Sequence, residues 1–279
     1  MFRIGRSLRG VAAVTCSLGI VPQLFAQSSL TPPAMMQVGC EWVKPGMGPA
    51  HDKHEERWAR VGEAVKGAAS SLALQSSTGP AVSCWLTAVT SYDQIGKNND
   101  LYTADARYSK ALPSLLSGDG PFISDFRGYI AVLRPDLSAG EMPNVVSRRV
   151  TTWGEWRVRF GTEANFVAAL KAFRAAATRA GTNPTFRTYQ VLQGAPATTF
   201  WIFSSEKSMA GFDAGMANDP KVAAAYTAED LKVFDEASTK SIASVITNIW
   251  SYNSAQSTLS AEQRASDPFW KLKAAPKKP

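Results

Sequence analysis

The sequence predicts an α+β protein built from two similar halves, each with the element order β-α-β-β-α-β, packed sheet to sheet. Two observations lead to this prediction. Matching segments recur at an offset of about 115 residues, so that Val43–Gly46 (VKPG) corresponds to Val158–Gly161 (VRFG) and Trp58 to Phe173. Within each half, strand-like and helical patterns follow in the same order. Recurrence of this kind indicates a repeated structural unit.

Further matches support the repeat. Residues 79–81 (GPA) precede the strand-like VSCWL, and residues 194–197 (GAPA) precede TTFWI. One extra residue in the second loop brings Trp85 onto Trp201. The segment Tyr102–Asp105 (YTAD) resembles Tyr226–Glu229 (YTAE), and each half closes with a strand-like run. Several matches in the same order favour a repeat over chance.

Residues 1–26 are typical of a secretory signal peptide. Three arginines precede an apolar stretch over residues 11–21, and Ala26 closes an acceptable cleavage site. The apolar stretch is shorter than the roughly 20 residues that span a bilayer. A buried N-terminal helix and a lipoprotein anchored at Cys16 are alternatives, although the residues before Cys16 fit the lipoprotein pattern poorly. We expect an exported protein, periplasmic or extracellular, without a membrane span.

The charge balance argues against a nucleic-acid partner. Removal of the three signal-peptide arginines would reduce the net charge from +7 to +4. Four lysines lie in the last nine residues, so the remaining chain is near neutral: Lys271, Lys273, Lys277 and Lys278. A nucleic-acid binder would carry a basic patch on the fold itself. We interpret residues 257–279 as a disordered basic tail.

The first half is expected over residues 37–138, after a linker over residues 27–36. Its elements are a strand at Val38–Val43, a helix at Pro49–Ala68, a hairpin of Ser71–Gln75 with Val82–Val89, an interrupted helical region, and a strand at 127–133. The second half is expected over residues 148–256, after a linker over residues 139–147. Its elements are a strand at Thr152–Val158, a helix at Thr162–Ala180, a hairpin of Phe186–Gln193 with Thr198–Ser204, a helical region, and a strand at 245–252.

Local patterns justify these elements. In the second helix, apolar residues recur at positions i, i+3, i+4 and i+7, beginning with Phe166, Ala169, Leu170 and Phe173. The hairpin strands are rich in β-branched and aromatic residues, and a Gly-Ala-Pro turn joins them.

The predicted β-α-β-β-α-β order is that of a ferredoxin-like unit. Two helices cover one face of such a sheet, and the other face must be buried against something. Over roughly residues 37–256 the layout resembles the dimeric α/β-barrel superfamily, in particular its antibiotic-biosynthesis-monooxygenase-like and NIPSNAP-like members. The resemblance rests on element order and on the junction of strand, basic residue, glycine and helix. It implies that two ferredoxin-like sheets face each other, here within one chain, so the protein could be a monomer.

Strand alternation then sorts the side chains by face. The residues expected to line the space between the sheets, and therefore the candidate ligand-binding residues, are Trp42, Trp85, Tyr129, Glu155, Arg157, Trp201, Asn248, Trp250 and Tyr252. Aromatic walls with a few polar groups form a common kind of small-molecule site. The same aromatics could instead hold the sheets together, and both roles can coexist. Glu155 and Arg157 could form an ion pair or anchor a substrate.

The pairing of Cys40 with Cys84 stays open at this point. The first and third strands are neighbours, so a bridge needs both side chains on one face. The alignment of Trp85 with Trp201 places Cys84 toward the helices, with Leu86, and Cys40 toward the space between the sheets.

His51 and His54 stand three residues apart at the start of the first helix, a spacing that brings two side chains to one helix face. They could bind a metal ion, which would need further Asp or Glu ligands, or haem, which some relatives in the superfamily bind through a helix histidine. Alternatively they are half-buried residues of a helical turn. Phe166 and Ala169 occupy the corresponding positions of the second half, so the histidines replace apolar residues on the face turned toward the sheet.

Three functions remain compatible with the sequence, which contains no P-loop, GxGxxG, GxSxG or HExxH motif. The first is binding or conversion of a small hydrophobic or aromatic molecule between the halves, by an oxygenase-like enzyme without a cofactor, as the resemblance implies. The second is a non-catalytic ligand-binding or stress-related exported protein. The third is a haem or metal protein that uses His51 or His54.

Overall fold

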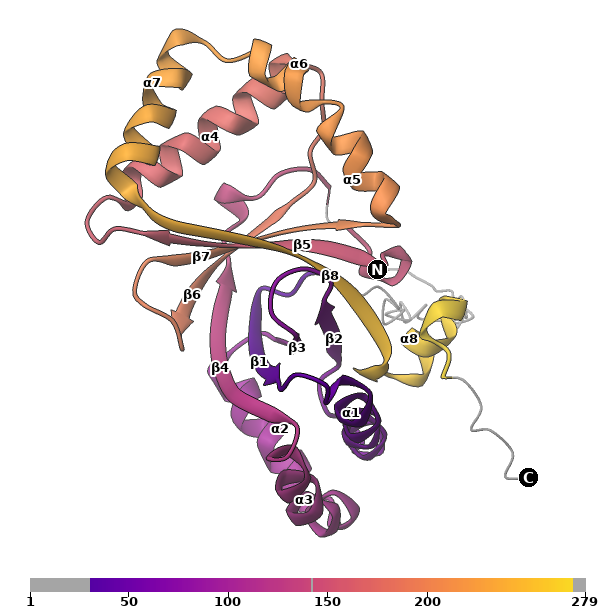
Figure 1. Cartoon of the computed structure of the whole chain (residues 1–279). Helices are drawn as coiled ribbons and strands as arrows, with labels where there is room; N and C mark the ends of the chain where they lie inside the picture. Colours follow the sequence, from indigo (N-terminus) through magenta and orange to yellow (C-terminus); the bar gives the residue numbers. More distant parts are fainter. Residues whose placement is uncertain (1–30, 142, 273–279) are drawn as a thin grey trace, which may run out of the picture.

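The computed structural model describes residues 31–141 and 143–272, and these form a closed barrel of eight antiparallel strands (Figure 1). Around the barrel the strand order is β1-β3-β2-β8-β5-β7-β6-β4. Each half contributes four consecutive strands of this order. The predicted fold class, with two ferredoxin-like halves in one chain, is confirmed.

The first half contains β1 (Met35–Val43), α1 (Gly48–Glu63), β2 (Ser71–Ser76), β3 (Val82–Val89), α2 (Tyr92–Ala104), α3 (Ala106–Asp119) and β4 (Ile123–Leu133). The second half contains β5 (Val150–Val158), α4 (Glu163–Arg179), β6 (Arg187–Gln193), β7 (Thr199–Glu206), α5 (Met209–Met216), α6 (Asp219–Ala224), α7 (Ala228–Glu236) and β8 (Ile242–Thr258). Helix α8 (Ala261–Ala265) follows β8.

Two seams join the half-sheets into one barrel. Strand β2 pairs with β8, with Leu74 opposite Tyr252. Strand β4 pairs with β6, with Leu133 opposite Tyr189. The halves therefore share backbone hydrogen bonds at both edges, and neither half-sheet keeps an open edge.

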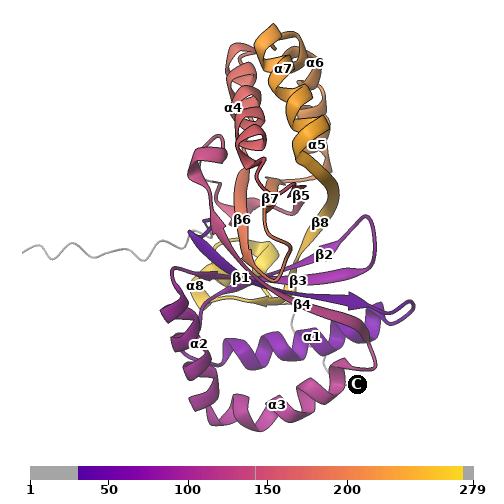
Figure 2. The ribbon, with the colours of Figure 1, turned by 90° about the vertical axis from the view of Figure 1, so that its left-hand side faces the viewer.

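The helices cover the outside of the barrel in two groups (Figure 2). Helices α1, α2 and α3 lie against the first half, and α4, α5 and α7 lie on the opposite side against the second. Helix α2 begins at a Ser91 cap, whose side chain accepts a hydrogen bond from the Gln94 amide, and α7 begins with a capping box of Thr227 and Asp230. None of the described helices is long and apolar enough to cross a bilayer.

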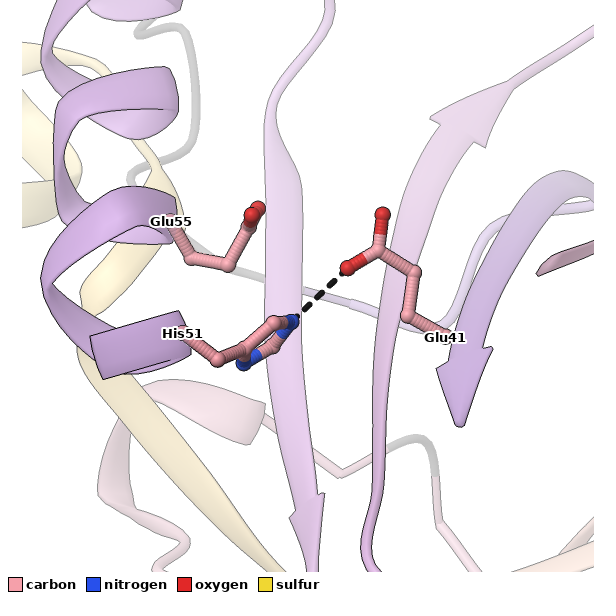
Figure 3. A group of neighbouring side chains, drawn as sticks. All are labelled: Glu41, His51 and Glu55. Carbon is pink, nitrogen blue, oxygen red and sulfur yellow. Dashed lines mark hydrogen bonds and ion pairs between the residues drawn. The ribbon is translucent and has the colours of Figure 1, made fainter. Parts of the chain in front are cut away.

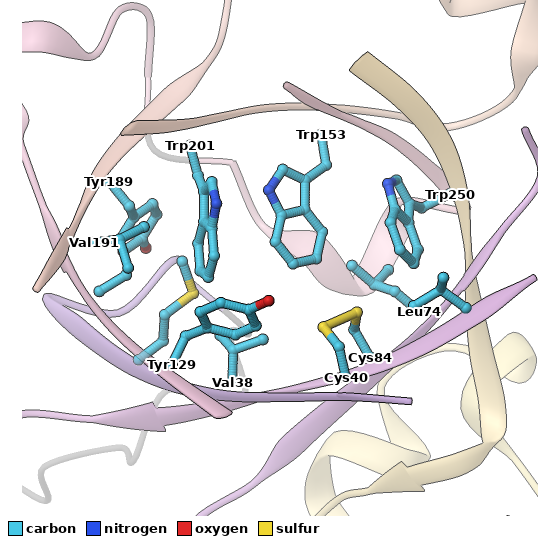
Figure 4. Packing of buried hydrophobic residues seen from close by; sticks show 13 residues of the cluster. Val38, Cys40, Leu74, Cys84, Tyr129, Trp153, Tyr189, Val191, Trp201 and Trp250 are labelled. Atoms are coloured by element: carbon cyan, nitrogen blue, oxygen red, sulfur yellow. A yellow bond between two sulfur atoms is a disulfide. The ribbon is translucent and has the colours of Figure 1, made fainter. Parts of the chain in front are cut away.

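The middle of the barrel is filled by side chains (Figure 4). Trp153 lies at ring-centroid distances of 4.8 Å from Trp201 and 5.1 Å from Trp250, and Tyr129 lies 5.2 Å from Trp201. Aromatic pairs at these separations contribute roughly 0.5–1.5 kcal/mol beyond their buried area. The aromatic packing role considered for these residues is therefore present at the centre of the barrel.

The register of the third strands corrects the sequence alignment. Cys40 lies opposite Cys84, and the equivalent Glu155 lies opposite Trp201. Cys84 is thus the counterpart of Trp201, and the second loop is two residues longer rather than one. A slip of one residue reverses the face of every side chain in a strand. Trp85 accordingly points toward the helices, and Cys84 and Leu86 point into the barrel.

Two boundary expectations also change. The expected disordered tail from residue 257 is wrong for residues 257–272, because β8 extends to Thr258 and Trp270 is fully buried beside Val145, Val146 and Leu259. The expected linker over residues 139–147 contains a short 3₁₀ turn, Val145–Ser147, that packs in the same cluster. The expected signal peptide over residues 1–26 lies outside the described residues, as do 273–279.

Candidate functional site

One mouth of the barrel contains a cavity of about 290 Å³. Its walls come from both halves. The lining includes seven of the nine residues that the sequence placed between the sheets: Trp42, Tyr129, Glu155, Arg157, Trp201, Asn248 and Trp250. We refer to this cavity as the barrel mouth.

The other two expected residues lie elsewhere. Trp85 faces α1, where its ring lies 6.4 Å from that of His51 and its Nε1 donates to the Gln256 carbonyl at 3.3 Å. The alignment slip described above explains this error. Tyr252 lies inside the barrel but lines a second cavity, of about 300 Å³, at the opposite end. Its hydroxyl contacts the Ser205 hydroxyl at 3.0 Å, and burial raises the pKa of Tyr252 to about 12.

Sequence reasoning missed several residues that line the barrel mouth, and three of them contribute most to its character. Trp153 precedes Glu155 by two residues on the same strand face, and Arg127 precedes Tyr129 in the same way, so alternation could have found both. The third is Cys84, which was expected to face the helices. It forms a disulfide with Cys40, whose inward position was expected and whose pairing was left open, and this disulfide lines the cavity and is almost fully buried. The opposed register of β1 and β3 brings these cysteines onto one face.

The charged groups of the barrel mouth are paired. Arg157 Nε donates to Glu155 Oε1 at 3.0 Å, and Trp201 Nε1 lies 3.4 Å from Glu155 Oε2. The Arg127 guanidinium lies 4.7 Å from the centre of the Trp42 ring, a cation–π contact. Of the two roles considered for Glu155 and Arg157, the ion pair is the one observed. It lies at the cavity wall and is partly exposed.

A second group of polar residues lies outside the barrel, between the first half-sheet and its helices (Figure 3). His51 Nε2 lies 2.8 Å from Glu41 Oε2, and Glu55, one helical turn further, points toward the same space. His51, Glu55 and Glu41 are 1%, 4% and 7% exposed, respectively. Ligand atoms of these three residues lie within 4.8 Å of one another. His54 is 6% exposed, so both histidines are buried rather than half-buried.

Burial, together with the charges of Glu41, Asp119 and Asp52, raises the pKa of Glu55 to about 9. A buried carboxylate without a compensating partner destabilises the folded state, and protonation removes the charge that causes this destabilisation. Glu55 Oε1 and His51 Nδ1 are both buried and have no hydrogen-bond partner among the described residues.

His54 is held differently. Its Nε2 lies 3.0 Å from the Leu115 carbonyl and 2.6 Å from Asp119 Oδ1. A carbonyl oxygen can only accept, so this nitrogen carries a hydrogen. At Gly118 any side chain would overlap the imidazole, so glycine leaves room for the His54 ring.

The haem alternative was considered for the same two histidines. An axial haem ligand needs a free imidazole nitrogen that faces the iron. Here a carboxylate oxygen lies 2.8 Å from Nε2 of His51 and another lies 2.6 Å from Nε2 of His54, so neither nitrogen has room for a porphyrin ring in front of it. These arrangements do not fit haem ligation.

Comparison with known proteins supports the fold. No protein-family model matches the sequence, and no curated protein matches it. Among solved structures, a "putative monooxygenase" from Fusobacterium nucleatum subsp. nucleatum superposes with a TM-score of 0.51 at 10% identity, over 78% of this chain and 91% of that one.

Two further structures are similar over most of their length. An anthrone oxidase-like protein gives a TM-score of 0.49 at 13% identity, over 84% of this chain and 98% of its own. A mutant chlorite dismutase from Candidatus Nitrospira defluvii gives 0.46 at 9% identity, over 82% and 96%. At these identities the likeness concerns the fold alone. The chain has the dimeric α/β-barrel fold, with both ferredoxin-like halves of the barrel supplied by one chain.

Proposed function

We propose that the protein binds a small aromatic or hydrophobic molecule in the barrel mouth. The observation that carries this proposal is the cavity of about 290 Å³, walled by Trp42, Trp153, Trp201 and Trp250. Small-molecule sites are typically concave and mostly apolar, with a few polar groups that fix orientation, and occupy roughly 300–1,000 Å³. The cavity therefore suits a compact ligand of one or two rings.

The polar groups of the mouth favour a ligand without a strong net charge. Glu155 and Arg157 neutralise each other, and Arg127 pairs with Asp125 at 2.8 Å. A charged ligand would have to break one of these pairs, whereas a hydroxyl or carbonyl group could hydrogen-bond to them as they stand.

A titration of the mature chain with a panel of uncharged aromatics of one or two rings, followed by the change in tryptophan fluorescence, tests the proposal. Trp42→Ala removes a wall of the mouth, and Trp85→Ala is the matched control, because Trp85 lies on the same half but outside the barrel. We expect at least tenfold weaker binding for Trp42→Ala and less than twofold change for Trp85→Ala. Equal effects of the two variants, or no binding by the wild type, would contradict the proposal.

Export is part of the proposed function. Residues 1–26 carry the signal-peptide pattern, and a buried disulfide is typical of proteins that mature in an oxidising compartment. Expression of the full chain in a bacterium, followed by fractionation and mass spectrometry, should give a periplasmic or secreted product that begins at Gln27. A full-length product in the cytoplasm would refute export.

Oxygenation of the bound molecule is the second candidate, favoured by the fold shared with the "putative monooxygenase". Its test is oxygen consumption by purified protein with each ligand that the titration identifies. Consumption that Trp42→Ala abolishes and Trp85→Ala leaves intact would support it. A ligand that binds without consuming oxygen would favour the non-catalytic role.

A further inference from the structure

The buried polar group of the first half is separate from the barrel mouth and points to a second site. We propose that Glu41, His51 and Glu55 bind one divalent transition-metal ion between strand β1 and helix α1. Their donor atoms lie within 4.8 Å of one another, and all three side chains point into one space (Figure 3). Two carboxylates and one imidazole form a ligand set that suits Mn²⁺, Fe²⁺ or Zn²⁺.

The two halves of the chain provide an internal comparison. At the offset of 115 residues, Glu41 corresponds to Trp156, His51 to Phe166, and Glu55 to Leu170. In the second half these residues pack with Leu137, Val158 and Phe200 as an ordinary apolar core. The fold therefore accepts apolar residues at these positions. The first half replaces it with three ionisable side chains, which a packing role alone does not explain.

The ionisable side chains of the first half leave buried polar atoms without hydrogen bonds, which destabilises the folded protein. Glu55 Oε1 and His51 Nδ1 are buried without a hydrogen-bond partner among the described residues. A cation bound to Glu55 and to His51 Nε2 would satisfy the carboxylate and compensate its charge.

The remaining nitrogen of His51 faces a carboxylate, although the two groups are not hydrogen-bonded. Metal-bound histidines commonly donate their second N–H to a carboxylate. His51 Nδ1 lies 3.9 Å from Asp52 Oδ1, beyond hydrogen-bond distance, and this oxygen accepts hydrogen bonds from the Gln75 and Gln256 side chains. With metal on Nε2, the hydrogen would reside on Nδ1 and face Asp52.

The neighbouring group of His54, Glu55 and Asp119 is a weaker candidate. Donor atoms of these residues also lie within 4.8 Å of one another. However, the hydrogen bond to the Leu115 carbonyl requires a hydrogen on His54 Nε2, which leaves that nitrogen without a lone pair for a metal. We therefore assign His54 and Asp119 as a structural pair beside the metal ion.

The proposed site has an open side. Glu41 and Glu55 line a cavity of about 990 Å³ between the first half-sheet and its helices, together with aromatic residues that include Trp58, Trp85 and Phe126. Three protein ligands and an accessible fourth position are typical of catalytic rather than structural metal sites. A small oxygen-donor ligand could reach the ion through this cavity.

Metal binding by the untagged mature protein tests the inference, since a histidine tag would itself bind metal. After treatment with EDTA, the protein is titrated with Mn²⁺, Zn²⁺ and Co²⁺ by calorimetry, and bound metal is counted by mass spectrometry. We expect one equivalent, and Co²⁺ absorption bands that report nitrogen and oxygen ligands. A protein that binds no metal in a several-fold excess of each ion would overturn the proposal.

Variants distinguish the proposed metal ligands from the structural pair of His54 and Asp119. Glu55→Gln and His51→Gln should each weaken binding by at least 100-fold, while Glu56→Gln, the same charge change on the neighbouring residue, should change it less than twofold. Asp119→Asn should change it less than fivefold. Loss of binding in Asp119→Asn with retention in His51→Gln would overturn the assignment. Melting curves in EDTA identify any variant that fails to fold. The proposal also requires that metal raise the melting temperature of the wild type, because an ion that binds only the folded state stabilises it.

Discussion

Reduction of the Cys40–Cys84 disulfide should cost the folded protein about 4 kcal/mol. The bridge joins β1 to β3 and closes a loop whose ends are 44 residues apart in sequence. For a loop of this length, the lost chain entropy of the unfolded state corresponds to about 4 kcal/mol at 25 °C, within the roughly 2–5 kcal/mol typical of native bridges. The third cysteine, Cys16, lies in the predicted signal peptide, so removal of that segment would leave no alternative pairing.

Guanidinium denaturation of the oxidised and the reduced protein measures this difference directly. Both forms keep the same atoms in the core except for two hydrogens, so the comparison isolates the cross-link. Tryptophan fluorescence is a suitable signal, because Trp153, Trp201 and Trp250 fill the barrel. A difference below about 1 kcal/mol would refute the reasoning. Thiol titration of the unreduced, denatured protein that finds two free thiols would show that the bridge is absent.

Other substitutions test the packing, the backbone and one ion pair. Trp201→Ala empties a fully buried site and should lower the free energy of unfolding by about 3–5 kcal/mol in the same denaturation assay; a loss below about 1 kcal/mol would show that the barrel can collapse around the space. Gly194→Ala should destabilise the fold by more than about 1 kcal/mol, because Gly194 has a φ of +88° and a methyl group would overlap the Gly128 carbonyl. Asp267 accepts two hydrogen bonds of 2.8 Å from Arg149, which lower the pKa of the carboxyl group. Its stabilising effect is present above the unfolded-state pKa of about 3.9 and is lost as the pH falls through the lower folded-state pKa. The melting temperatures of the wild type and Asp267→Asn should therefore converge as the pH falls from about 5 toward 2; a constant difference would contradict the pairing.

Much of the fold could be predicted because its signals are local. The strand Val82–Val89 has the predicted bounds, and β1, β5, β6 and β7 differ from prediction by three residues or fewer at either end. Alternation then assigned most inward-facing residues correctly. It failed at Trp85, where an uncertain loop length shifted the alignment by one position and reversed the face.

The site was harder to predict, because its geometry depends on residues distant in sequence. Comparison of the two halves placed His51 on the sheet-facing side of its helix. It did not reveal that Glu41, ten residues earlier on β1, faces the same imidazole, or that Leu115 binds His54. The filled centre of the barrel and the separate cavities at its ends depend on packing across eight strands. No single stretch of sequence encodes that packing.

The two seams, β2 with β8 and β4 with β6, have a consequence for which substitutions the protein can accumulate. A barrel assembled from two identical subunits contains each side chain twice, related by a two-fold axis, so any substitution alters both halves at once. Here the halves are encoded separately, and a change in one leaves the other intact. Closure is also independent of protein concentration, because the partner sheet is always attached. One half can therefore keep an apolar core that holds the barrel together, while the other accumulates buried charges that a symmetric assembly would have to carry twice.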